Sequence, residues 1–136
     1  MADTFALTIL TPYGLYFEGR VEFLEVRSEK YNLGILPNHA PLISTIVVSK
    51  IVIKMGGKNY DYATGGGAIY VKKEGATLVL DSIEKSDEID LERAKQAKER
   101  AEKRLSESSF DEEIDVQRAK LALLKAINRI NIGSKD

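Results

Sequence analysis

The stretch Glu88–Lys95, EIDLERAK, is repeated 25 residues later as Glu113–Lys120, EIDVQRAK. Each copy opens a strongly helical pattern. Asp90 and Asp115 stand where a carboxylate can accept hydrogen bonds from the free N–H groups of a first helical turn, and their charge suits the positive end of a helix. The repeat therefore predicts two helices of related sequence in the C-terminal part of the chain.

A polar gap at 106–109 separates the two helical patterns, and Ser109 with Glu112 forms an alternative capping box for the second helix. Apolar residues recur at helical spacing in both: Leu91, Ala94, Ala101 and Leu105 in the first, and Val116, Ala119, Leu123, Ile127 and Ile130 in the second. An alanine buries little more than a methyl group, worth on the order of 0.8 kcal/mol at most. We predict an antiparallel hairpin with a weak seam, ended by Gly133.

Basic residues form a second repeated row, at offsets of 7 and 11 from the first member. The two rows are Arg93, Arg100 and Arg104, then Arg118, Lys125 and Arg129. These offsets lie close to one helix face. Two interpretations remain open. Each row is a solvated face with ion pairs to glutamates such as Glu92, Glu99 and Glu102, or the two rows lie side by side and hold an anion.

Composition excludes several functional classes. The 136 residues carry a formal net charge of −1, so no global field recruits nucleic acid or an acidic membrane. There is no cysteine and one histidine, which argues against disulfides and against metal or catalytic sites built from those residues. No apolar run approaches the roughly 20 residues of a membrane span, and no signal-peptide pattern is present. We expect a cytoplasmic protein that reaches a membrane only through a partner.

Composition also changes near residue 85. Residues 1–85 hold nine of the ten aromatic residues, nine of the ten glycines and all three prolines, whereas residues 86–136 hold 23 of the 41 charged residues. We predict an α+β fold of two domains. Residues 1–85 form an N-terminal β-sandwich of about ten strands, and residues 86–136 form a C-terminal antiparallel two-helix hairpin.

Alternation of apolar residues indicates short strands in the first domain, among them 5–10, 13–17 and 21–26. In 21–26 the apolar positions shift from odd to even, which indicates a bulge or burial of both faces. Gly56 and Gly57 mark a hairpin. The triple glycine 65–67 precedes a strand and lacks a Lys-Ser or Lys-Thr pair, which favours a tight bend or close backbone approach over a phosphate loop.

His39 lies in a turn between Asn38 and Ala40-Pro41. We expect either a side chain bonded to the nearby backbone or an exposed contact on a partner surface. No carboxylate or nucleophile is adjacent to it in the sequence, and no nucleophile–base or metal constellation is recognisable elsewhere. The chain is therefore expected not to be an enzyme by itself.

Three ordered motifs resemble a known family. Residues 33–42, LGILPNHAPL, resemble the signature turn of the epsilon subunit of bacterial F-type ATP synthases. Residues 65–68, GGGA, resemble that family's next landmark, and residues 89–94, IDLERA, match its ATP-binding motif of Ile or Leu, Asp, two variable residues, Arg and Ala. The resemblance covers essentially the whole chain.

This resemblance implies a β-sandwich at the foot of the rotating central stalk, against the gamma subunit and the ring of c subunits. It implies helices that extend into the head of alpha and beta subunits, meet an acidic segment of the beta subunit and inhibit ATP hydrolysis. ATP is then a regulatory ligand that favours the compact hairpin, with no catalytic cofactor. The implied location is the cytoplasmic face of the bacterial plasma membrane, as part of the ATP synthase.

Carried over residue by residue, the implied ATP contacts are Glu84, Ile89, Asp90, Arg93, Ala94, Arg100, Lys125 and Arg129. The implied contacts with the stalk and c ring are Asn32 and His39, and those with the acidic segment are Arg104 and Arg118. Lys125 stands where strong ATP binders tend to carry arginine, and lysine lacks a planar fork of donors. Asn32 stands where many members have an acidic residue. The alternative function is a stand-alone β-sandwich protein that binds and senses ATP.

Overall fold

The computed structural model describes residues 3–107 and 113–134. The chain divides into two compact units, Met1–Lys85 and Ser86–Asp136, which are described separately below. The described part of the first unit contains ten strands: β1 (Phe5–Thr11), β2 (Gly14–Val21), β3 (Phe23–Arg27), β4 (Asn32–Ile35), β5 (Leu42–Ile46), β6 (Ser49–Met55), β7 (Lys58–Thr64), β8 (Gly67–Lys72), β9 (Gly75–Leu80) and β10 (Ile83–Lys85). The second contains a short 3-10 helix, η1 (Ser86–Glu88), followed by α1 (Leu91–Glu107) and α2 (Glu113–Gly133).

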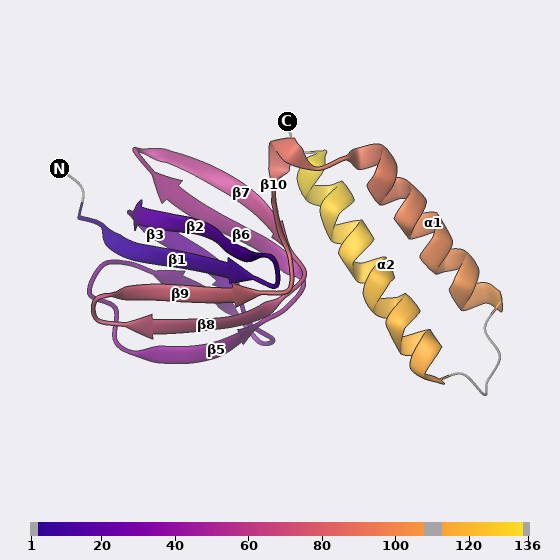
Figure 1. The fold of residues 1–136 in the computed structure, drawn as a ribbon, viewed down its shortest axis with the longest axis horizontal. Helices are drawn as coiled ribbons and strands as arrows, with labels where there is room; N and C mark the ends of the chain where they lie inside the picture. The colour runs from indigo at the N-terminus through magenta and orange to yellow at the C-terminus, as the bar shows by residue number, and fades with distance from the viewer. Residues whose placement is uncertain (1–2, 108–112, 135–136) are drawn as a thin grey trace. The chain divides into compact units, whose positions relative to one another are not determined.

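The strands form two five-stranded sheets, which confirms the predicted sandwich (Figure 1). One sheet has the order β2-β1-β9-β8-β5 and the other the order β10-β7-β6-β3-β4. All pairings are antiparallel except β1 with β9, which is parallel. Strand residues alternate between buried and accessible positions, as Phe5, Leu7 and Ile9 do in β1. The side chains that point inward form one apolar core.

The shift in apolar phase at residues 21–26 marks a change of sheet, and the predicted single strand there was wrong. β2 continues to Val21 and pairs with β1, whereas β3 begins at Phe23 and pairs with β4 and β6. Only Glu22 separates them, so the chain passes from one layer to the other. The buried positions therefore change from odd-numbered residues, such as Val21, to even-numbered ones, Leu24 and Val26. The register shift that the structure does contain lies between Ile9 and Leu10, where β1 pairs with β2.

Two glycine positions explain how neighbouring strands meet. Gly56 and Gly57, with φ of 56° and 78°, form the two-residue turn between β6 and β7, as predicted. At Gly67, which opens β8, an added Cβ would lie 2.0 Å from the carbonyl oxygen of Val79. A strand follows the triple glycine, so close backbone approach is the correct interpretation of this segment.

The two helices run antiparallel side by side, as predicted (Figure 1). Asp90 caps α1: its Oδ1 accepts a hydrogen bond from the N–H of Arg93 at 3.1 Å, and its carbonyl accepts one from Ala94 at 3.0 Å. The matching prediction for Asp115 was wrong, because α2 begins at Glu113 and Asp115 is its third residue. The capping box of Ser109 and Glu112 lies outside the described residues.

Candidate functional site

Small residues form the interface within the helical unit. In its described part the buried apolar residues are Ala94, Ala101, Ala119, Ala126 and Ile132. The four alanines, spaced seven apart in each helix, are here called the alanine seam. Seven residues are close to two turns, so each pair lies on one face of its helix. Side chains this short let two helices approach closely but give little apolar area, which makes the contact tight and weak.

Gly133 ends α2, which confirms the predicted end of the helix, but it does so without the left-handed conformation of a glycine cap. Its φ is not positive, so it is not a left-handed cap but the last residue of α2. An added Cβ would lie 3.0 Å from Cδ2 of Leu91 and 3.1 Å from Cγ2 of Ile89. Glycine therefore fits the close approach of the side chains of Ile89 and Leu91, which would have to shift to admit a Cβ.

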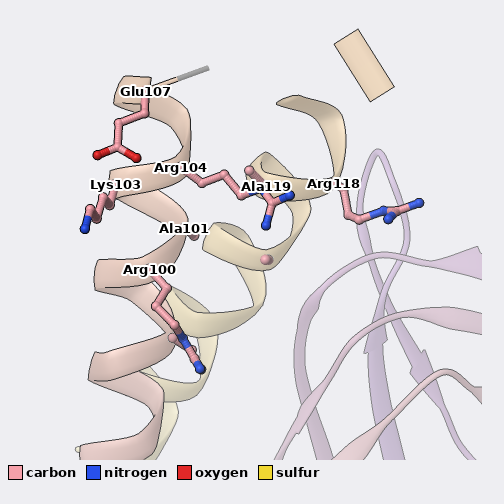
Figure 2. A pocket seen from close by; sticks show the side chains of 9 residues that line it. Arg100, Ala101, Lys103, Arg104, Glu107, Arg118 and Ala119 are labelled. Carbon is pink, nitrogen blue, oxygen red and sulfur yellow. The ribbon is translucent and has the colours of Figure 1, made fainter. Parts of the chain in front are cut away.

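A groove lies toward the other end of the hairpin, between α1 and α2. It has a volume of about 690 Å³ and is lined by Ala97, Arg100, Ala101, Lys103, Arg104, Glu107, Arg118, Ala119 and Ala122. We call it the arginine groove. In Figure 2, Arg100 and Arg104 extend from α1 toward α2, and Lys103 and Glu107 lie on the far side of α1. Arg118 borders the groove with its guanidinium turned away from α1.

The arginines of the groove are exposed and, among the described residues, have no ionic partner. Arg93, Arg100, Arg104 and Arg118 are all exposed, and none makes an ion pair or a side-chain hydrogen bond within residues 3–107 and 113–134. The ion pairs that the solvated-face interpretation requires with Glu92, Glu99 and Glu102 are not formed there. Lys125 and Arg129 differ, since both are half-buried and each is engaged in at least one hydrogen-bonding or electrostatic contact.

The predicted site residues separate along the hairpin. Two observations define the antiparallel register. Gly133 lies against Leu91 at one end of the hairpin, and Arg104 and Arg118 line the same groove toward the other end. In that register Arg129 lies level with Arg93, about three turns from Arg104. The structure thus brings Arg100 together with Arg104 and Arg118 around one groove, which Arg93, Lys125 and Arg129 do not line.

The apolar members of the predicted ATP motif take part in packing. Ile89 is half-buried and touches the position of Gly133, and Ala94 is 3% exposed within the alanine seam. Asp90 is exposed, and one of its carboxylate oxygens is engaged in capping α1. Arg93 is exposed one turn beyond it. Glu84 belongs to the sandwich unit, where it is half-buried in β10 and pairs with Ala63 of β7.

The two predicted stalk contacts lie on the sandwich unit. Asn32 is exposed at the start of β4, where its Oδ1 accepts a hydrogen bond of 3.3 Å from Nη1 of Arg27. His39 is half-buried, and its Nδ1 lies 2.6 Å from the carbonyl oxygen of Ala40. The prediction of a turn histidine bonded to nearby backbone is confirmed. Asn38, with φ of 64°, makes the turn.

Sequence reasoning missed Ala126 and Ile132 as buried residues, and Gly133 as a packing position. The seven-residue spacing of the alanines was the available signal, because it repeats in both helices. Lys103 and Glu107, which also line the groove, stand outside the repeated basic rows and carry no such signal.

Two features are absent from the part of the chain that the structure describes. No helix there combines the length and apolar character that a membrane crossing requires. In the same residues, no group of three or more histidine, aspartate or glutamate side chains is placed to hold a metal ion.

Two family models together match nearly the whole chain. Residues 4–86 match the model described as "ATP synthase, Delta/Epsilon chain, beta-sandwich domain", and residues 87–133 match "ATP synthase, Delta/Epsilon chain, long alpha-helix domain". An ATP synthase epsilon chain of Desulforamulus reducens is 44% identical over 106 residues, which is 78% of this chain and 80% of that protein. One from Bacillus thuringiensis is 38% identical over 104 residues, 76% of this chain and 78% of that protein.

Solved structures share the fold. A chain in the cryo-EM structure of Euglena gracilis mitochondrial ATP synthase, OSCP/F1/c-ring in rotational state 1, has a TM-score of 0.77 at 19% identity, over 92% of this chain and 78% of that one. A chain in the Tetrahymena thermophila mitochondrial ATP synthase structure, central stalk and c ring, has a TM-score of 0.68 at 13% identity, over 98% of both chains.

Proposed function

This chain belongs to the delta/epsilon chain family of ATP synthases, and we propose that it is a non-catalytic, regulatory rotor subunit of a bacterial F-type enzyme. The sandwich unit acts as the fixed, partner-binding part, and the helical unit acts as a gate on ATP hydrolysis. The observation that carries this proposal is the contrast between the two interiors. The sandwich buries large aliphatic side chains, whereas the hairpin buries mainly alanine.

An exposed apolar strip on the sandwich supports a protein partner. Across one sheet, Ile43 of β5 pairs with Tyr70 of β8, and Val79 of β9 pairs with Leu10 of β1. All four side chains are exposed, with Ile43 at 75%, and Leu15 of β2 extends the strip beside Leu10. Large apolar side chains in register on an outer sheet face are typical of an interaction surface. We assign this surface to the gamma subunit, and Asn32 and His39 to the c-subunit ring.

The helical unit has the properties of a two-state element. α1 has 17 residues and α2 has 21, so each spans about 25 to 32 Å in the hairpin and the pair spans nearly 60 Å end to end. Because the alanine seam contributes little apolar burial, a modest binding energy is enough to change which form is populated. In the extended form, Arg104 and Arg118 would meet an acidic segment of the beta subunit in the head.

ATP is proposed as the ligand that favours the hairpin. Arg93 is exposed without an ionic partner in the described residues, and in the antiparallel register Arg129 lies level with it. With Arg100 and Lys125 these cations would face the phosphates, while Asp90, Ile89 and Ala94 would hold the adenosine end. Calorimetry with ATP and the whole chain tests this. Arg93→Gln should weaken ATP binding about threefold to tenfold, while Lys95→Gln, an exposed control on α1, should not.

The regulatory role is tested in the assembled enzyme. ATP hydrolysis by the complex reconstituted with the full chain should be slower than with the chain cut after residue 86, and low ATP should increase the difference. Equal rates at every ATP concentration would remove the inhibitory role and leave a passive stalk component. A second candidate, a stand-alone ATP sensor, predicts that the chain does not purify with other ATP synthase subunits. We expect co-purification, at the cytoplasmic face of the plasma membrane.

A further inference from the structure

We propose that the arginine groove is a binding site for a phosphate-bearing anion, separate from the nucleotide set proposed above and sharing only Arg100 with it. Two guanidiniums, of Arg100 and Arg104, extend across the groove from successive turns of one helix toward the other. Side chains four residues apart lie on the same face of a helix, with their Cβ atoms about 6 Å apart. One tetrahedral anion between them can therefore accept hydrogen bonds from both.

The charge of the groove favours a dianion. Two cations, Arg100 and Arg104, extend across the groove; Arg118 borders it with its guanidinium turned away, and Lys103 and Glu107, of opposite charge, lie together on the side of α1 away from α2. The three arginines have no ionic partner in the described residues. A phosphate carries a charge of about −1.5 to −2 at neutral pH, whereas a single carboxylate carries −1, so phosphate matches two guanidiniums better. Guanidinium groups also present paired donors that fit phosphate oxygens.

The alanines give the anion access. Ala97 and Ala101 of α1 and Ala119 and Ala122 of α2 line the groove with methyl groups only, so nothing longer competes for the arginine side chains. Arg118 is exposed and turned away, and an exposed arginine changes rotamer on the nanosecond scale. It can thus become the third ligand and join α2 to α1 through the anion. The bound anion would fasten the groove end of the hairpin, as Gly133 against Ile89 and Leu91 fastens the other.

The probe is inorganic phosphate, titrated into the full chain and followed by NMR of backbone amides and arginine Nε–H groups, with sodium chloride at matched ionic strength as the blank. We expect saturable shifts at Arg100, Arg104 and Ala119. Arg104→Gln should raise the dissociation constant for phosphate about threefold to fivefold, as expected for the loss of an exposed ion pair. Arg100→Gln with Arg104→Gln should abolish saturation. Lys120→Gln, an exposed α2 control outside the groove, should bind phosphate normally.

Three results would overturn the proposal: shifts of equal size in sodium chloride, unchanged binding in the double variant, or saturation by an acidic peptide without saturation by phosphate. Pyrophosphate and ATP, titrated separately, distinguish free phosphate from a nucleotide tail as the source. Arg93→Gln separates this site from the proposed nucleotide site. It should lower affinity for ATP and leave the response to inorganic phosphate unchanged, so failure of either proposal can be recognised without the other. Far-UV circular dichroism confirms that each variant is helical.

Discussion

Asp90 combines a structural contact with a proposed ligand contact, and one pair of substitutions separates them. Its Oδ1 caps α1 through the N–H of Arg93. Asp90→Asn keeps an acceptor oxygen and removes the charge, whereas Asp90→Ala removes both. We expect Asp90→Ala to lower the stability of the helical unit by about 1 kcal/mol and Asp90→Asn to leave it nearly unchanged. Denaturant unfolding measures both, and calorimetry with ATP on the asparagine variant measures the ligand role alone. Equal stability of all three proteins would contradict the capping role.

Gly67 is the position at which the sandwich tolerates a side chain least. A Cβ there would lie 2.0 Å from the carbonyl oxygen of Val79 and 2.9 Å from Cα of Leu80, both backbone atoms of the paired strand β9. Gly67→Ala must therefore separate β8 from β9, and we expect at least about 2 kcal/mol of lost stability by denaturant unfolding. The matched control is Gly56→Asn, because asparagine tolerates the left-handed φ of 56° and nothing lies within 4 Å. A neutral Gly67→Ala would show that the sheet relaxes there.

The residues that were predictable from sequence are those whose role is local. The Asp90 cap depends on the five residues 90–94, about one helical turn, and the turn at Gly56 and Gly57 depends on two residues. Positions defined by another segment were missed. Gly133 ends α2, as expected, but its contact with Ile89 and Leu91, about forty residues earlier in the chain, was not foreseen. The arginines that line one groove are likewise set by the register of α1 against α2. The spacing of residues within one helix does not determine that register.

At the level of elements, the alanine seam sets how the hairpin responds to substitution. Ala126 is 1% exposed in the seam, so Ala126→Leu must push α2 away from α1. We expect a loss of about 1 to 3 kcal/mol for the helical unit, measured by far-UV circular dichroism during denaturation. Ala122→Leu adds the same atoms on the same helix at an exposed position beside the groove, and should change stability by no more than about 0.5 kcal/mol. Equal effects of the two substitutions would mean that the seam is not tightly packed.

Strands show a different limit of prediction from sequence. Alternation correctly indicated most of the strands, because inward and outward residues differ in polarity along β1 and β8. The same alternation cannot distinguish a bulge from a passage between sheets, since both reverse the parity of the buried face. That ambiguity explains the error at Glu22, where β2 ends in one sheet and β3 starts in the other.

At the level of the whole molecule, the two units differ in where their stability arises. Every buried member of the apolar core of the sandwich lies between Phe5 and Ile83. The fragment 1–85 should therefore fold alone, with cooperative thermal unfolding followed by near-UV circular dichroism. The fragment 86–136 buries mainly alanines in its described part and should be only partly helical in isolation. Loss of cooperativity in the fragment 1–85 would mean that the sandwich needs the helices.

This asymmetry predicts how nucleotide changes the melting of the complete chain. A ligand that binds only one folded unit stabilises that unit by about 2.7 kcal/mol at 100 times its dissociation constant. Because most of the proposed ATP contacts lie on α1 and α2, ATP should raise the unfolding temperature of the helical unit and leave that of the sandwich nearly unchanged. Helicity by far-UV circular dichroism and the tyrosine signal distinguish the two transitions, since all six tyrosines precede residue 86. The Arg93→Gln chain is the matched control, and its helical transition should shift less. A parallel shift of both transitions would indicate that nucleotide acts on the sandwich as well, and no shift at millimolar ATP would rule out nucleotide as the ligand that holds the hairpin closed.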